Sequence, residues 1–320
     1  MPQAAAGAFP LRRFAATRIS QAIESDLKIA GGQGTVEGVH RSALNIRCGD
    51  RLLTLAHESM GGLPNGILVD PPIPFGQVGI APGMSVQWDG IALRVPGASM
   101  VVFLTGAASW SPAMPIVDAM STQDQIPRAQ HALELAAAQA PQVGLGPLLV
   151  GIVDERASIG SLGRAAARSL ADILLALREG ASERAIAKAV PLIGLGPGAT
   201  PSGDDLLVGL MAGLAATDHP LARAFAAGVA REAIGITTSV SECYLRHAGR
   251  LEFSERVQAA AAAVLRGPVA DLDGALTAAL TWGASSGADL LVGLLVAIQA
   301  SAPGLPRRLQ ACALERIVAA

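Results

Sequence analysis

The pattern of hydrophobic and polar positions changes about a third of the way along the chain. Between about residues 34 and 104, short apolar runs partly alternate with polar positions. Gly49-Asp50 and Asp89-Gly90 each lie between two such runs, which is typical of hairpins. The pattern predicts strands within 35–48 and over 51–57, 85–88, 91–95 and 100–104. We therefore expect a β-rich first domain, built as an antiparallel sheet or a small barrel.

Helical spacing governs the rest of the chain. Leu11, Phe14, Ile19, Ile23 and Leu27 predict a helix over 11–28. Residues 111–127 contain three prolines and predict a connection. Beyond it, alanine and leucine predict helices near 128–140, 161–179, 182–190, 204–217, 220–233, 238–248, 253–266, 270–280 and 287–300. The predicted fold is α+β, with a β-rich domain and N-terminal helix over 1–125 and a mainly helical domain over 126–320.

Several features indicate a cytoplasmic protein. The apolar runs 206–216 and 290–300 are each about a dozen residues long, whereas a membrane-spanning helix needs about 20. We therefore expect buried core helices and no membrane. The first residues contain no apolar segment typical of a secretion signal. Cys48, Cys243 and Cys312 are odd in number and widely spaced, which indicates a reducing compartment instead of a disulfide framework.

Charge narrows the classes of partner. The net charge is −2 and the chain has no basic tail, so we expect no nucleic acid. Charged residues make up 16% of the chain and hydrophobic residues 51%. Such a composition suggests that a partner covers some apolar surface, so we expect an oligomer or the subunit of a complex.

One sequence repeat stands out in the helical part. The string SGDDLLVGL at 202–210 is nearly repeated by SGADLLVGL at 286–294, with Asp204 replaced by Ala288. The offset of 84 residues is too long for a solenoid. The repeat indicates either two halves of a duplicated domain or two equivalent helix starts that meet. In the second case, Ser202, Asp205, Ser286 and Asp289 would face one shared cleft.

A glycine-rich turn leads into the first copy. From Gly194 to Asp205 the chain has four glycines and two prolines. Glycine permits positive φ and proline stiffens the turn, so free N–H groups at the start of a helix are well placed for an anion. A simpler alternative is that Ser202-x-x-Asp205 and Ser286-x-x-Asp289 are capping boxes. Capping does not account for the Gly-Pro-Gly lead-in or for Asp204.

Known phosphate loops fit poorly. The turn has no lysine, which excludes a Walker A sequence, and its likeness to a dinucleotide fingerprint is loose because Pro197 and Pro201 stand where a helix would begin. Two adjacent carboxylates also oppose a bare phosphate. Mg²⁺ or an arginine could offset them. Alternatively, the aspartates accept hydrogen bonds from a substrate amide or amine while backbone N–H groups hold its anionic end, and we favour this arrangement.

This hypothesis assigns the candidate site. Catalytic roles fall to Asp204, Asp205 and Asp289, and no metal ligand is assigned, although Mg²⁺ remains an alternative cofactor. The residues expected to bind substrate are Gly196, Gly198, Thr200, Ser202, Gly203, Thr238, Ser286 and Gly287. Cys243 and His247 have the spacing of two metal ligands on one helical face, but no partner pair is visible and a structural role is favoured.

The central string LGPGATPSGDDLLVGL at 195–210 resembles the signature of the AllH-like family. Weaker matches lie, in the expected order, at Asn45, 63–67, 238–245 and the second SGxD at 286–289, so the resemblance covers most of the chain. Ala199 departs from the family motif, which commonly has a bulkier apolar residue there. The change is expected to affect packing.

The resemblance implies a subunit of oxamate carbamoyltransferase, a transferase of bacterial allantoin and purine catabolism. Such an enzyme moves a carbamoyl group between oxamate and carbamoyl phosphate. Oxamate carries an amide and a carboxylate, and carbamoyl phosphate carries an amide and a phosphate. Both are small substrates of the amide-plus-anion kind expected above. The resemblance also implies other subunits as partners. A non-catalytic scaffolding subunit and a Mg²⁺-dependent enzyme acting on a small carboxylate or phosphate remain the alternatives.

Overall fold

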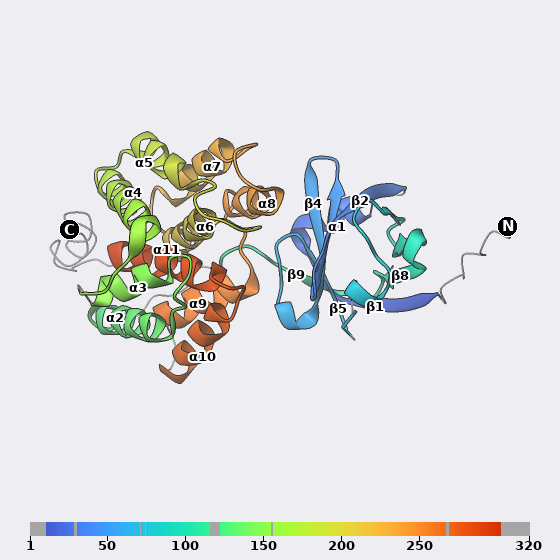
Figure 1. Cartoon of the computed structure of the whole chain (residues 1–320), viewed down its shortest axis with the longest axis horizontal. Coiled ribbons are helices and arrows are strands. Elements are labelled where there is room, and N and C mark those ends of the chain that lie inside the picture. Colours follow the sequence, from blue (N-terminus) through green and yellow to red (C-terminus); the bar gives the residue numbers. More distant parts are fainter. Residues whose placement is uncertain are drawn as a thin grey trace. The chain divides into compact units, whose positions relative to one another are not determined.

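The computed structural model describes residues 11–28, 31–70, 72–73, 75–115, 122–154, 156–266 and 269–301, so Cys312 lies outside the described part. Internal contacts divide the chain into two compact units, Met1–Pro112 and Ala113–Ala320 (Figure 1). Ala113 forms an isolated β-bridge with Glu252, and the Met114 N–H donates to the Leu251 carbonyl at 2.9 Å. These bonds join the chain to the helical unit some way before residue 126.

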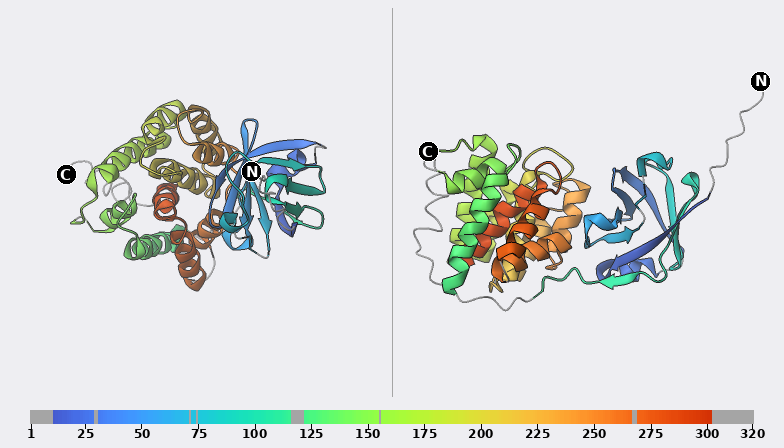
Figure 2. Two further views of the ribbon diagram at one scale, coloured as in Figure 1. Left: turned by 45° about the vertical axis from the view of Figure 1, so that its right-hand side comes forward. Right: turned by 90° about the horizontal axis from the view of Figure 1, so that it is seen from below.

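The first unit is a closed barrel. The strands are β1 (Arg12–Ser20), β2 (Gly32–Val39), β3 (Ala43–Cys48), β4 (Arg51–His57), β5 (Gly66–Val69), β6 (Ser85–Trp88), β7 (Ala92–Val95), β8 (Met100–Phe103) and β9 (Ala108–Trp110). They are ordered β5-β4-β3-β2-β6-β7-β8-β1-β9, and a further pairing of β5 with β1 closes the barrel. Figure 2 shows the strands curving around the interior. Of the two expected forms, the small barrel is correct.

The barrel is not purely antiparallel. β4 pairs with β5 in parallel, and β1 pairs with β8 and β9 in parallel. The expected hairpins are present between β3 and β4 and between β6 and β7. In the second turn, Asp89 Oδ1 accepts the N–H groups of Ile91 and Ala92, and Gly90 has φ of 84°. These turns follow from local chemistry, as expected.

The helix predicted over 11–28 is wrong for its first half. Residues Arg12–Ser20 form β1, and only Gln21–Leu27 form a helix, α1. The Ser20 side chain caps α1 by accepting the Ala22 N–H at 3.3 Å. Long-range pairing with β5, β8 and β9 outweighs the local spacing. Ile23 and Leu27 of α1 are buried in the barrel core, so α1 belongs to the barrel. The pattern also does not predict β5 and β9.

The second unit is helical. Its helices are α2 (Thr122–Gln139), α3 (Gly146–Val153), α4 (Gly160–Arg178), α5 (Ser182–Ala189), α6 (Ser202–Ala216), α7 (Ala222–Glu232), α8 (Ser239–Ala248), α9 (Glu255–Leu265), α10 (Val269–Leu280) and α11 (Ser286–Ser301). They follow the predicted ranges closely, except that α2 begins within the expected connection and the pattern does not predict α3. The α+β class is confirmed.

The repeat forms the centre of the helical unit. Helices α6 and α11 pack together along their length and are buried almost throughout, with the other helices around them (Figure 1). Their neighbours match in pairs. α7 and α8 contact α6 and each other, as α2 and α3 do around α11. Likewise, α4 packs on α5 as α9 packs on α10. The unit therefore consists of two similar halves. One half is α4–α8. The other half is formed by α9–α11 together with α2–α3, which precede α4 in the sequence.

In the described part of the chain, no helix has the length and apolar character that a membrane crossing requires.

Candidate functional site

The glycine-rich turn has left-handed backbone at three glycines before α6. Gly194, Gly196 and Gly198 have φ of 73°, 104° and 109°, which other residues rarely adopt. No hydrogen bond to a described residue is made by the N–H groups of Gly196, Gly198, Ala199, Thr200 and Ser202. The Gly203 N–H, in contrast, donates to the Leu195 carbonyl at 2.9 Å. The turn therefore offers a run of free donors that ends before Gly203.

Capping does not explain Ser202. Pro201 is the N-cap residue of α6, and no side chain of the described residues caps this helix. Ser202 is already the first helical residue and is 2% exposed. The capping-box alternative is therefore wrong for α6.

The two helix starts meet, as the repeat suggested. The hydroxyls of Thr200, just before α6, and Ser286, the first residue of α11, lie 2.9 Å apart and share a hydrogen bond. Contacts between the helices advance in the same direction, from Gly209 beside Leu290 to Gly213 beside Ala297. The helices therefore run parallel, and both N-termini lie at the same end.

Two further helix starts join this cluster. Thr238 caps α8, and its hydroxyl donates to the Ala199 carbonyl in the turn at 2.5 Å. Leu145 is the N-cap residue of α3, and its N–H donates to Asp289 Oδ1 at 2.5 Å. The starts of α3, α6, α8 and α11 thus surround the aspartates. Helix N-termini carry partial positive charge, so they favour negative charge at this place.

Asp204 fixes the turn. Its Oδ1 accepts the Gly194 N–H at 2.9 Å, and its Oδ2 accepts the Thr237 hydroxyl just before α8. Burial raises the pKa of Asp204, whereas the hydrogen bonds from Thr237 and Gly194 lower it. Both oxygens of this side chain have a partner, so Asp204 joins the turn to the start of α8.

Both carboxylate oxygens of Asp289 also accept hydrogen bonds. Besides the Leu145 N–H on Oδ1, the Ser285 hydroxyl donates to Oδ2 at 2.8 Å. Burial raises the pKa of Asp289, and its hydrogen bonds, including one from Ser202 of the other repeat, lower it. Asp289 therefore joins α11 to the start of α3.

Asp205 differs from both. It is 8% exposed, and its Oδ2 is buried but accepts no hydrogen bond from any described residue. Burial raises the pKa of Asp205 well above its usual range, the hydroxyls of Ser286 and Thr200 lower it, and Asp289 and Asp204 raise it further. Buried polar atoms normally have a partner, so the free oxygen of Asp205 requires an explanation.

The remaining candidate glycines have a packing role. A Cβ atom on Gly203 would overlap the Leu192 carbonyl oxygen, and one on Gly287 would overlap the Ala279 carbonyl oxygen. Gly203 follows Leu192 by eleven residues, whereas Gly287 follows Ala279 by eight. The turn before α6 is therefore three residues longer than its counterpart, which matches the length of its Gly-Pro-Gly sequence.

Two aromatic residues near the aspartates were missed by the sequence reasoning. Tyr244 of α8 and Trp282 before α11 contact edge-to-face, with centroids 6.4 Å apart. Burial raises the pKa of Tyr244, and so do the charges of Cys243 and Asp205. Asp205 is thus close enough to influence the phenol. A lone tyrosine in a helical pattern gives no signal of this proximity.

Metal ligation finds little support among these side chains. His247 Nδ1 lies 2.6 Å from Glu252 Oε2, in an ion pair or hydrogen bond that fits the favoured structural role. Each oxygen of Asp204 and Asp289 already accepts a hydrogen bond. Within the described ranges, no three or more His, Cys, Asp and Glu side chains are grouped so that they could hold a metal. Mg²⁺ would find one free carboxylate oxygen here, that of Asp205.

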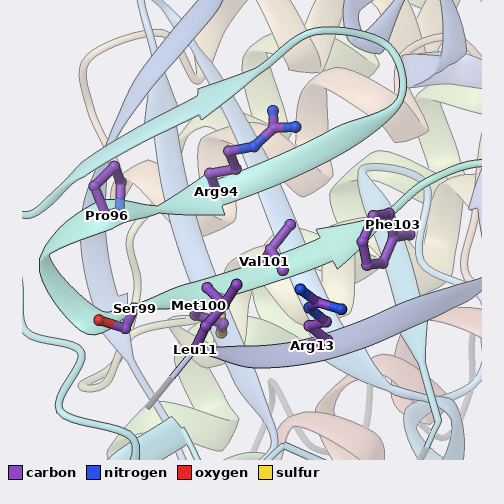
Figure 3. Close-up of a pocket in the computed structure, with 8 residues that line it drawn as sticks. All are labelled: Leu11, Arg13, Arg94, Pro96, Ser99, Met100, Val101 and Phe103. Atoms are coloured by element: carbon purple, nitrogen blue, oxygen red, sulfur yellow. The ribbon is translucent and has the colours of Figure 1, made fainter. Parts of the chain in front are cut away.

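A separate pocket of about 510 Å³ lies on the barrel. Figure 3 shows Arg13 of β1 and Arg94 of β7 on either side of β8, which carries Val101 and Phe103. Arg94 forms an ion pair with Asp89 at 2.7 Å. The sequence pattern does not predict this pocket, because its residues come from three strands.

Two family models match the chain. One, described as oxamate carbamoyltransferase subunit AllH, matches residues 192–298, which include the turn and both copies of the repeat. The other, described as the AllH family N-terminal domain, matches residues 13–109, which form the barrel. No curated protein and no solved structure matches the chain. The joined helix starts and the barrel are thus the two matched regions, and the chain belongs to the AllH family of oxamate carbamoyltransferase subunits.

Proposed function

We propose that this carbamoyltransferase subunit binds a small amide-bearing anion, oxamate or carbamoyl phosphate, at the turn from Gly194 to Asp205. The observation that carries the proposal is the buried Asp205 carboxylate, whose Oδ2 has no described partner beside a turn with free N–H groups. The family description supplies the reaction class. The pathway we propose is purine-nitrogen catabolism in the cytoplasm.

The two ends of such a substrate match two parts of the site. Its amide N–H would donate to Asp205 Oδ2. Its carboxylate or phosphate would accept from the N–H groups of Gly196, Gly198, Ala199 and Thr200, where the helix starts also favour negative charge. Thr200 is adjacent to both parts, because its hydroxyl lowers the pKa of Asp205 while its N–H belongs to the turn. Ser202, Thr238 and Ser286 hold the surrounding backbone and hydroxyl network.

The aspartates take different roles in this proposal. Asp205 is the residue that touches the substrate. Asp204 and Asp289 are positioning residues, since donors from the turn, α3 and the lead-in to α8 already occupy their oxygens. Gly203 and Gly287 permit close packing, and Gly196 and Gly198 give the turn its conformation.

The chemical step then needs orientation and one proton acceptor. Transfer from carbamoyl phosphate to oxamate forms a bond between the oxamate nitrogen and the carbamoyl carbon. It breaks the carbamoyl C–O bond, releases phosphate and removes one proton from the nitrogen. The Asp205 carboxylate would orient that nitrogen and accept its proton, while the turn holds an anionic end.

A surface beside the turn suits contact with another subunit. Ile234 and Ile236 are 60% and 57% exposed on either side of Gly235. The Ile236 carbonyl oxygen lies beside Gly194, 3.6 Å from the position of a Cβ atom there, and Thr237 follows with its bond to Asp204. Exposed apolar residues next to a site are typical of protein interfaces. We propose that a partner subunit covers this loop.

Calorimetric binding of oxamate and of carbamoyl phosphate, each with and without Mg²⁺, tests the proposal. Asp205→Asn is the matched variant, because it keeps the shape of the side chain. Binding by the wild type that the folded variant loses by tenfold or more supports the site. Undiminished binding by Asp205→Asn would reject the role of Asp205. Failure of the folded wild type to bind either ligand would favour the scaffolding alternative, and binding only with Mg²⁺ would favour the metal-dependent one.

A further inference from the structure

The equivalent aspartates of the two repeats, Asp205 and Asp289, have different hydrogen-bond donors. Asp205 and Asp289 occupy the same place, four residues after Pro201 and Ser285 respectively. In both repeats the aspartate N–H donates to the carbonyl of that earlier residue, at 3.2 Å from Asp205 to Pro201 and 2.9 Å from Asp289 to Ser285. The backbones are therefore equivalent, and the side chains at Pro201 and Ser285 can be compared directly.

In the second repeat, Ser285 supplies a hydrogen-bond donor to the carboxylate of Asp289. Its hydroxyl donates to Asp289 Oδ2 at 2.8 Å. Pro201 has no hydroxyl and no N–H, and one oxygen of the equivalent carboxylate, Asp205 Oδ2, is buried without a described partner. The first repeat thus lacks one donor that the second repeat contains.

We infer that Pro201 determines the specificity of the site by keeping Asp205 Oδ2 vacant for an N–H group of the ligand. The inference rests on the function proposed above and narrows its substrate class. The ligand donor takes the place that the Ser285 hydroxyl takes beside Asp289. The contact of the Ser285 hydroxyl with Asp289 Oδ2 is therefore equivalent to the contact that we expect between the ligand N–H and Asp205 Oδ2.

The surroundings select an uncharged donor. The starts of α3, α6, α8 and α11 lie around the aspartates, so their partial positive charges already offset the negative charge of the carboxylates and no cation is required there. A neutral carboxamide or carbamoyl NH₂ supplies the missing N–H donor without adding a charge, whereas an ammonium group would supply a donor and add a positive charge. Oxalate, which replaces the amide of oxamate by a second carboxylate, has no N–H group and no O–H donor at neutral pH.

The test compares Pro201→Ser with Pro201→Ala. Pro201 has φ of −55° and ψ of 142°, which serine and alanine adopt without strain. Both variants lose the proline ring and gain a backbone N–H, but only serine adds the hydroxyl that Ser285 supplies in the second repeat. Oxamate and oxalate binding and the melting temperature Tm are measured for the wild type and both variants.

We expect the wild type and Pro201→Ala to bind oxamate within a few-fold of each other and at least tenfold more tightly than oxalate. Pro201→Ser should have a higher Tm than Pro201→Ala and bind oxamate at least tenfold more weakly. Oxamate binding by Pro201→Ser equal to that of Pro201→Ala would overturn the inference. So would weaker binding without the higher Tm, since the serine would then disturb the turn. If the folded wild type binds neither oxamate here nor carbamoyl phosphate in the calorimetric test of the proposed function, that function fails as well.

Discussion

Gly209 of α6 lies against the main-chain carbonyl of Leu290 in α11, so closely that a Cβ atom on the glycine would overlap the carbonyl oxygen. The equivalent residue of the second repeat, Gly293, makes the reciprocal contact with the Leu206 carbonyl. Two glycines at the crossing let the parallel helices approach each other at backbone distance. This approach brings Asp205 and Asp289 to one end of the helical unit.

The glycine crossing predicts a large loss of stability on adding one methyl group. Gly209→Ala or Gly293→Ala should destabilise the helical unit by about 2–3 kcal/mol or more, because backbone on both sides cannot move aside easily. Gly274→Ala in α10 is the control, since nothing lies within 4 Å of its added Cβ. The control should be stabilising by about 0.5–1 kcal/mol. Urea unfolding followed by helical circular dichroism measures all three. A crossing variant as stable as the wild type would contradict the packing.

Asparagine substitution should distinguish Asp289 from Asp205. Asp289→Asn replaces hydrogen bonds to a carboxylate from the Leu145 N–H and the Ser285 hydroxyl by weaker bonds to a neutral amide and should cost about 1–3 kcal/mol. Asp205→Asn removes a buried charge whose Oδ2 has no described partner, so stability should stay equal or rise. The same unfolding measurement compares the two variants. Equal destabilisation by both would show that Asp205 is as fully bonded as Asp289.

The link from Asp204 to the lead-in of α8 predicts a local effect on the turn. Thr237→Val removes the hydroxyl that donates to Asp204 Oδ2 and should destabilise the unit by about 1.5–3 kcal/mol. Hydrogen exchange at Gly194, whose N–H donates to Asp204 Oδ1, should accelerate more than exchange in α4. Thr237→Ser keeps the hydroxyl and should behave like the wild type. Unchanged exchange at Gly194 in Thr237→Val would argue against this role of Asp204.

The buried aspartates predict an unusual dependence of stability on pH. Burial raises the pKa of Asp204, Asp205 and Asp289 above their ordinary value of 3.8. Between that value and the raised pKa values, the folded state binds more protons than the unfolded state. The free energy of unfolding contributed by these groups should therefore fall as pH rises through this window.

Asp205→Asn isolates the effect, because it removes the carboxyl whose pKa is raised well above the ordinary value. The fall in unfolding free energy from about pH 4 upward should be smaller in the variant than in the wild type. Urea unfolding at several pH values gives the difference between the two proteins. Identical slopes would mean that the pKa of Asp205 is not raised in the folded state.

Local chemistry in the sequence determined much of the fold. Gly49-Asp50 and Asp89-Gly90 specify their hairpins through turn geometry and, at Asp89, through side-chain bonds to nearby N–H groups. Apolar periodicity located the helices of the second unit to within a few residues, with α3 and the start of α2 as the exceptions. The repeat at 202–210 and 286–294 indicated either a duplicated domain or two helix starts that meet. Each of these signals lies within a short stretch of chain.

Only the tertiary structure decided the rest, because the decisive partners are far apart in sequence. Residues with helical spacing from Arg12 onward became β1 through pairing with distant strands. Asp289 Oδ1 receives the N–H of Leu145, 144 residues away, and Asp204 Oδ2 receives the hydroxyl of Thr237, 33 residues away, and no local pattern names either donor. A pattern of side chains specifies where a carboxylate stands in a helix. Which distant donors reach each carboxylate depends on how the helices pack, whereas the difference between Pro201 and Ser285 is already present in the sequence.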